Sequence, residues 1–376
     1  MLSGLLVRII LNLKTFLFCH HYFIITNRKV YKEWVPIIEY KWVWLMLLKS
    51  INILKSMQSS NGLFSAASCA KTGYHRAWIR DNVYTALGLE ASGNKKEVIK
   101  AYRALLDILL KHEWKIDLAI KQKPNYHFEY IHPRYELNGN EIYENWGNKQ
   151  NDAIGAFLFK IGDLEEKGIK IIRNKKDLRI LQKLVNYLKS VEYWHDKDNG
   201  MWEENEEVHA SSVGACIAGL KKIRKIIGIE VENKLIEKGI ETLDMLLPNE
   251  SESKSVDLAL LSLIYPYNIV NEKQKNQILK NIEIKLVRNK GLIRYLGDRY
   301  YSNGKEAEWT FGFPWLAIIY KDLKMPHKYA FYMRKTTECF NEKGELPELY
   351  FGETDEHNEN CPLAWSQAMY VTALTG

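Results

Sequence analysis

Apolar residues recur at every third or fourth position through most of the chain after about residue 44. The segment LRILQKLVNYL at 178–188 is typical, and this spacing places apolar side chains on one face of an α-helix. Gly and Asn separate such segments, as at Asn199-Gly200 and Asn303-Gly304. No stretch shows the sustained alternation of a β-strand, so an all-α fold is expected. The pattern predicts twelve helices, near 44–59, 81–92, 95–112, 151–166, 175–195, 208–226, 229–246, 255–265, 271–287, 307–321, 326–341 and 362–375.

The predicted helices alternate in character along the chain. From the third onward, the odd-numbered helices carry Lys and Glu on one face, as in KEVIKAYRALLDILLKHEWK. The even-numbered helices are rich in Ala, Gly, Ser and aromatic residues, as in HASSVGACIAGL. A polar face indicates contact with water, and a surface of small apolar residues indicates burial all round. Six outer–inner pairs predict an (α/α)6 toroid over residues 44–376, with parallel inner helices that all begin on one face.

The first 43 residues form a separate N-terminal extension, helical or disordered. Residues 1–26 are apolar, but an uninterrupted membrane span is broken by Arg8, Lys14, His20 and His21. No small-residue cleavage site follows, which argues against a secretory signal. Three interpretations stand: a non-native extension with Met46 or Met57 as the true start, an amphipathic segment lying on a surface, and, least favoured, a membrane anchor.

Charge and cysteine usage exclude several classes of protein. Residues 1–57 carry +6 of the formal charge of +7, so the rest of the chain is nearly neutral. It has no block of basic residues with interleaved aromatics, and a nucleic-acid partner is not expected. Five cysteines without a CxxC pair indicate free thiols and a cytoplasmic location. No grouping of His and Cys and no Gly-rich phosphate loop is present, so no metal or cofactor is expected.

The unusual chemistry lies in the segments that precede the inner helices. They contain many Trp, Tyr, Arg, Asp and Glu residues and read GYHRAWIRD, HPRYELNGNEIYENWGNKQND, DNGMWEENEEV, RYLGDRYYSNGKEAEWT and GELPELYFGETDEHNEN. If the inner helices begin on one face, these five loops converge on one rim. Aromatic rings stack on sugar rings, and Arg and Asp bind sugar hydroxyls, so the composition favours a carbohydrate ligand.

Cleavage of a glycosidic bond requires one protonated and one ionised carboxyl group. Glu203 is the candidate acid, because it follows Trp202 just ahead of a closely packed helix. Apolar surroundings and the neighbouring charge of Glu204 would both favour its protonated form. The alternative is a solvated acidic loop that supplies negative charge to a helix start.

Glu348 is the candidate base. It lies between hydrophobic neighbours in ELPELYFG, ahead of the last inner helix. The alternative is a turn carboxylate that caps or pairs locally. Glu345 and Glu353 are rivals in the same loop.

Taken together, the loop motifs resemble those of the glucoamylase family, glycoside hydrolase family 15. The resemblance also extends to the phosphorylase kinase α and β subunits. It is carried by Trp202-Glu203-Glu204 after Asn199-Gly200, by Trp78-Ile79-Arg80-Asp81, by Trp146-Gly147 with Gln150 and Asp152, by Arg294-Tyr295 with Asp298, Tyr300, Tyr301 and Asn303-Gly304, and by Pro347-Glu348-Leu349-Tyr350 with Trp365-Ser366.

The resemblance implies an (α/α)6 barrel and inverting release of β-D-glucose from the non-reducing ends of soluble α-1,4-glucans or malto-oligosaccharides. Glu203 would be the acid and Glu348 the base. The implied substrate-binding residues are Arg80, Asp81, Trp146, Trp202, Glu204, Arg294, Trp78 and Trp309. The alternatives for these residues are a structural ion pair at Arg80-Asp81, core packing of the tryptophans and a plain surface arginine at 294.

Two other functions fit the same motifs. A trehalase on the same scaffold would have the same glucose pocket. A glucan-binding or regulatory module of the phosphorylase-kinase type would bind sugar without turnover. Retention of both Glu203 and Glu348 favours an enzyme.

Overall fold

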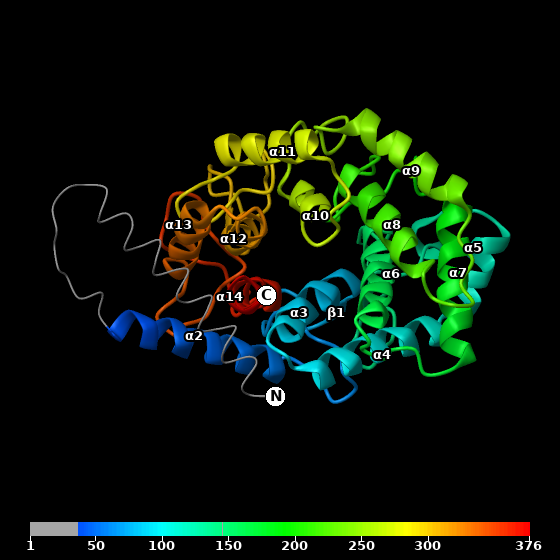
Figure 1. Ribbon diagram of the computed structural model, residues 1–376, viewed down its shortest axis with the longest axis horizontal. Coiled ribbons are helices and arrows are strands. Elements are labelled where there is room, and N and C mark those ends of the chain that lie inside the picture. The colour runs from blue at the N-terminus through cyan, green and yellow to red at the C-terminus, as the bar shows by residue number, and fades with distance from the viewer. Residues whose placement is uncertain (1–36, 145) are drawn as a thin grey trace.

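The computed structural model describes residues 37–144 and 146–376, and its helices form two concentric rings (Figure 1). The inner ring contains α3 (Ile79–Ala91), α6 (Asn151–Glu166), α8 (Ala210–Ile223), α10 (Leu261–Ile264), α12 (Gly312–Asp322) and α14 (Ala364–Thr375). The outer ring contains α2 (Ile37–Ser56), α4 (Lys95–Lys111), α7 (Lys175–Val191), α9 (Asn233–Leu246), α11 (Glu272–Lys285) and α13 (Pro326–Thr337). The predicted (α/α)6 toroid is confirmed.

The burial of each ring follows its composition. Helix α6 is buried without interruption from Asn151 to Leu164, whereas α7 buries one stripe of side chains that includes Leu181 and Leu184. Small residues allow the inner helices to approach closely: a Cβ atom on Gly155 of α6 would lie 2.4 Å from the backbone carbon of Ala215 in α8. Close approach between α6 and α8 therefore depends on this glycine.

Several helix boundaries differ from the predicted ones. Among the described residues, the helix predicted near 44–59 is α2, which spans Ile37–Ser56. The helix predicted near 255–265 is only a 3-10 turn, η2 (Leu258–Leu260), followed by the short α10. The helix predicted near 307–321 begins at Gly312, because the residues before it form a strand.

Helix α5 (Glu113–Lys121) was not predicted. It follows α4 after one residue, His112, so the apolar pattern of 95–112 was interpreted as ending there. The side chains of Trp114 and Leu118 are exposed on α5, which weakens the contrast between its two faces. A further 3-10 turn, η1 (His127–Glu129), comes next.

Two short antiparallel ladders join the loops at the start of the inner helices. Strand β1 (Ala77–Trp78) pairs with β2 (Arg134–Tyr135), and β3 (Glu308–Trp309) pairs with β4 (Leu349–Tyr350). Two-residue strands are too short to show alternation, which is why the sequence did not reveal them. The ladders hold together loops that are far apart in the chain.

No helix among the described residues is long and apolar enough to cross a membrane. The interpretations offered for residues 1–26 fall outside the part of the chain that the structure describes.

Candidate active site

A cavity of about 210 Å³ opens where the five unusual loops meet. Its wall contains all ten residues proposed from the sequence as a site: Trp78, Arg80, Asp81, Trp146, Trp202, Glu203, Glu204, Arg294, Trp309 and Glu348. The wall is completed by Tyr74, Met201, Tyr300, Phe311, Leu363 and Trp365. The cavity is smaller than the roughly 300–1,000 Å³ of a site for a drug-sized molecule, and therefore suits one small polar unit.

Arg80 and Asp81 lie in the first turn of α3, directly after strand β1. The Arg80 guanidinium is buried, and its Nη1 donates to Gln150 (2.9 Å) and Asp152 (3.1 Å). Burial raises the pKa of Asp81 to about 7, and the nearby charge of Arg80 opposes this rise. Near neutral pH Asp81 can therefore both donate and accept hydrogen bonds to a bound hydroxyl.

Glu203 lies at the tip of a hairpin loop closed by the pair Asp198 and Glu207. Its backbone has a φ of +63°, in the left-handed region that non-glycine residues seldom adopt. Its carboxylate accepts from Arg80 Nη2 at 3.0 Å and from the indole N–H of Trp146. The prediction of apolar surroundings for Glu203 is thus wrong, because the guanidinium of Arg80 on α3 lies against its carboxyl group.

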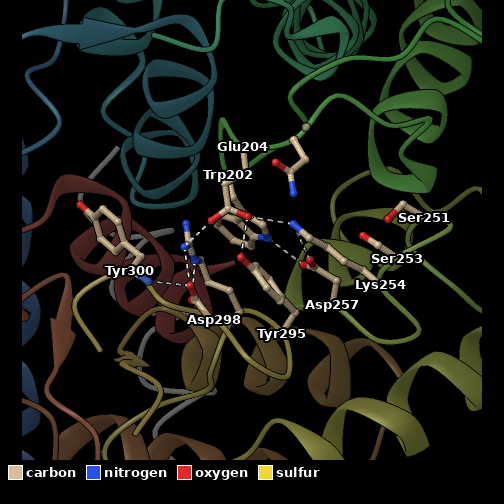
Figure 2. A network of polar contacts seen from close by, with 12 residues as sticks. Trp202, Glu204, Ser251, Ser253, Lys254, Asp257, Tyr295, Asp298 and Tyr300 are labelled. Carbon is tan, nitrogen blue, oxygen red and sulfur yellow. Dashed lines mark hydrogen bonds and ion pairs between the residues drawn. The ribbon is translucent and has the colours of Figure 1, made fainter. Parts of the chain in front are cut away.

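Glu204 points into a different set of partners (Figure 2). Its carboxylate accepts from Arg294 Nη2 (2.7 Å), the Tyr295 hydroxyl (2.7 Å) and Lys254 Nζ (3.0 Å). Burial opposes ionisation, but the charges of Arg294 and Lys254 lower the pKa of Glu204. Glu204 is consequently held ionised, and its charge is largely neutralised by its partners.

Arg294 is enclosed by aromatic rings and by a second carboxylate. Its Nε and Nη2 donate to the two oxygens of Asp298, both at 2.7 Å. Its guanidinium carbon lies 4.9 Å from the centre of the Tyr300 ring and 5.1 Å from that of Trp309. It is therefore not a plain surface arginine.

Glu348 is fully buried at the start of strand β4. Its backbone is fixed on both sides, since its N–H donates to Asn360 O (2.9 Å) and its carbonyl accepts from Thr310 N–H (3.1 Å). Oε2 accepts from the side-chain amides of Asn358 (2.5 Å) and Asn360 (2.8 Å), whereas the buried Oε1 has no hydrogen-bond partner among the described residues. Burial raises the pKa of Glu348, and the two amides oppose that rise.

The two rivals of Glu348 lie away from the cavity wall. Glu353 is exposed and pairs with Lys305 at 3.2 Å. The Glu345 carboxylate lies 3.9 Å from the Cys361 thiol. The geometry therefore brings Glu348, rather than Glu345 or Glu353, to the site.

Aromatic rings make up much of the wall. Trp202 and Trp309 have ring centres 5.7 Å apart, and Phe311 stacks on Trp365 at 4.7 Å. Trp146 is 37% exposed at the mouth and lies over the guanidinium of Arg134, 4.4 Å from its carbon. A cavity with aromatic walls and a few convergent polar groups suits a sugar ring, whose faces are apolar and whose edge carries hydroxyls.

The family model for glycosyl hydrolases family 15 matches residues 44–307. The chain belongs to this family. The sequence resemblance is therefore confirmed for both fold and family. Four residues with carboxyl groups, Asp81, Glu203, Glu204 and Glu348, line its aromatic-walled cavity.

Solved glycosidases share the family 15 fold of this chain. A wild-type glycosidase superimposes with a TM-score of 0.78 at 17% identity, covering 90% of this chain and 98% of the other. The glucoamylase of Saccharomycopsis fibuligera superimposes with a TM-score of 0.63 at 14% identity, covering 89% of this chain and 94% of the other.

The curated relatives of this family 15 chain carry a different name. The probable phosphorylase b kinase regulatory subunit alpha of Drosophila melanogaster is 25% identical over 401 residues, or 85% of this chain and 31% of that protein. The liver isoform of this subunit in Mus musculus is 28% identical over 280 residues, or 64% of this chain and 22% of that protein. The chain thus spans less than a third of these relatives.

Sequence reasoning missed several residues of this family 15 site, of which Tyr74 is the most informative. Its hydroxyl lies 2.9 Å from that of Tyr300, and it contacts the same cavity as Glu348. Burial, and then the charge of Glu348, raise the pKa of Tyr74, so the phenol stays protonated. A usable signal existed, because Tyr74 lies four residues before Trp78 in the first of the five loops.

Proposed function

We propose that residues 44–376 form the catalytic domain of an inverting, exo-acting α-glucosidase that releases β-D-glucose from the non-reducing ends of soluble α-1,4-glucans or malto-oligosaccharides. The observation that carries this proposal is that Glu203 and Glu348, from loops far apart in the sequence, both line one small cavity. The family and its glycosidase fold support the reaction class.

In this proposal Glu203 protonates the glycosidic oxygen as the bond breaks. Arg80 and Trp146 fix the orientation of its carboxyl group. A positioned general acid accelerates such a step by about 10²–10⁴-fold.

Glu348 takes a proton from the attacking water. Its Oε1 is the acceptor, since Oε2 already receives the amides of Asn358 and Asn360. Water then attacks the face of the sugar opposite the leaving group, so the configuration at the anomeric carbon inverts.

The remaining wall residues hold the terminal glucose. Arg80 and Asp81 bind hydroxyls at the closed end, and Arg294 and Glu204 bind on the side toward the next sugar. The rings of Trp78, Trp202 and Trp309 pack against the faces of the bound sugars, while Trp146 lies at the mouth. The small volume restricts the cavity to one terminal unit, which accounts for exo action.

Glucose release by the full chain from maltotetraose, panose and trehalose tests this proposal. We expect release from maltotetraose, and none by the Glu348→Gln variant. Release from trehalose alone would instead indicate a trehalase.

A second candidate function is a glucan-binding regulatory module without turnover. The observation that favours it is that the curated relatives are named as regulatory subunits of phosphorylase b kinase. Binding of maltotetraose by calorimetry, with no glucose released from any of the three sugars, would support this function and overturn the first.

A further inference from the structure

One short segment contacts the loop of Glu203 at Trp202, Glu204 and Glu207. We call residues 198–207 the acid loop, and residues 250–257, which read ESESKSVD between α9 and η2, the brace. The last three residues of the brace fall in the helix predicted near 255–265, and none of the five loop motifs lies in the brace. Its interest lies in its contacts with the acid loop.

The contacts run in antiparallel order along the two segments (Figure 2). Asp257 Oδ1 accepts from the indole N–H of Trp202 at 2.8 Å, and Lys254 Nζ donates to Glu204 at 3.0 Å. Further along, the hydroxyls of Ser251 and Ser253 both donate to Glu207 at 2.7 Å. The brace therefore holds the residues on both sides of Glu203.

The brace also contacts the start of helix α8, through its first residue, Glu250. The carbonyl of Glu250 accepts from Ala210 N–H at 2.7 Å, and its carboxylate accepts from the N–H of Ser211 at 3.1 Å. The buried ring of His209 lies 3.4 Å from the same carboxylate. The start of α8, which follows the acid loop in the chain, is thus tied to the brace by backbone and side-chain bonds.

Lys254 is the central residue of the brace. Its side chain is buried, and its Nζ lies 3.0 Å from Glu204 and 3.9 Å from Asp257, the partner of Trp202. The same ammonium lies 3.9 Å from the centre of the Tyr295 ring. One cation therefore contacts Glu204, which follows Glu203, and Asp257, which binds Trp202 on the other side of Glu203.

The acid loop requires such support because of its backbone. Gly200 and Glu203 both have a φ of +63°. A non-glycine residue keeps a left-handed backbone only where its surroundings determine the conformation. Trp202 is anchored by Asp257 and Glu204 by Lys254. The residue between them, Glu203, therefore has its side-chain direction fixed by its two neighbours.

We propose that the brace, residues 250–257, is a positioning device that fixes the acid loop so that Glu203 points into the cavity, and that Lys254 is its central positioning residue. The proposal rests on the proposed function of Glu203. It assigns to Lys254 no contact with substrate and no proton transfer.

The test compares Lys254→Met and Lys254→Arg with the matched control Lys275→Met in the full chain. Lys254 and Lys275 are both 8% exposed, and Lys275 pairs with Glu272 on the outer helix α11. The readouts are kcat and KM for maltotetraose, the melting temperature, and the indole N–H resonance of Trp202 in ¹⁵N-labelled protein, assigned with Trp202→Phe.

We expect Lys254→Met to lower kcat about 10- to 100-fold, since small displacements of a catalytic group have effects of this size, and to change KM much less. The Trp202 resonance should move in this variant. Lys254→Arg should restore most of kcat, and Lys275→Met should change neither kcat nor the resonance. An unmoved resonance in Lys254→Met, or a kcat equal to that of Lys275→Met, would overturn the proposal.

Two further outcomes are decided by separate readouts. If Lys254→Met does not fold, Asp257→Asn takes its place, because Asn keeps the shape of the side chain while weakening the hydrogen bond from Trp202. An unmoved Trp202 resonance in Asp257→Asn would overturn the proposal that the brace positions the acid loop. If the wild type releases no glucose, the proposed function fails, and the resonance alone decides whether the brace holds the loop.

Discussion

Arg80, in the first turn of α3, forms an ion pair with Glu203, with Nη2 3.0 Å from Oε1. The other terminal nitrogen of the same guanidinium, Nη1, donates to Gln150 and Asp152. One planar group thus connects three loops and sets the direction of the Glu203 carboxylate.

This geometry predicts that Arg80→Lys lowers kcat/KM by about 10²-fold or more. An ammonium is a point donor and cannot bind Gln150, Asp152 and Glu203 in the directions that a guanidinium provides. Steady-state kinetics on maltotetraose would measure the loss. Activity within threefold of the wild type would contradict the role given to Arg80.

The two carboxylates can be tested against close neighbours. Glu203→Gln and Glu348→Gln should each reduce kcat by about 10²–10⁴-fold, with little change in melting temperature. Glu206→Gln in the acid loop and Glu345→Gln, three residues before Glu348, are the matched controls, because both residues lie off the cavity wall. If Glu345→Gln were inactive and Glu348→Gln active, the assignment of the base would be wrong.

The pH dependence of activity should follow Glu348. As the base it must be ionised, so kcat/KM falls as pH decreases through its pKa, which burial raises and the Asn360 amide lowers. Asn360→Ala removes that donor, and the acidic limb of the profile should move to higher pH. A profile of kcat/KM from acid to neutral pH measures the shift, and a limb that moved to lower pH would argue against Glu348.

The stereochemistry of the product is a fourth test of the mechanism. NMR of fresh product from maltose should show β-glucose first. A co-crystal structure with glucose should place the carboxyl groups of Glu203 and Glu348 about 6.5–9.5 Å apart, with room for water. Formation of the α anomer first would require a retaining mechanism.

The stability of the fold should depend on His209. Burial opposes its protonation, but the hydrogen bond to Glu250 and the charge of Asp198 outweigh burial and raise the pKa of His209 to about 9. Because the folded state holds this proton more tightly than the unfolded state, the stabilisation is complete below about pH 6.5 and is lost as pH rises toward 9. The loss should be on the order of 3 kcal/mol.

Urea denaturation between pH 6 and 9 would measure this loss. His209→Gln should remove most of the pH dependence above about pH 8, because carboxyl groups such as Asp81, whose pKa is raised to about 7, titrate below that pH. The exposed His195 provides the control, and His195→Gln should keep the wild-type slope. Equal slopes for the wild type and His209→Gln would contradict the prediction.

Much of the site could be predicted because each motif lies directly ahead of a predicted inner helix. Parallel inner helices bring their starting ends together, so Trp78, Glu203 and Glu348 had to approach one another once the toroid was inferred. Local sequence thus located the residues, and helix packing, together with the two short ladders, placed them on one rim.

The partners of these residues could not be predicted in the same way. Arg80 is more than a hundred positions from Glu203, and nothing in the local sequence of the acid loop indicates a guanidinium there. The brace has an ordinary polar loop composition, so the role of Lys254 depends on three-dimensional contacts. Helix α5 was missed for a local reason, because its exposed Trp114 and Leu118 obscure its pattern.

The separation between buried inner helices and the polar segments that precede them has an evolutionary consequence. Under the proposed function, replacing Glu203 and Glu348 would remove turnover, and the interhelical contacts, such as the one at Gly155, would stay as they are. A lineage could therefore turn a catalyst into a sugar sensor without rebuilding its scaffold. The barrel can therefore be inherited without the reaction, because the two depend on different residues.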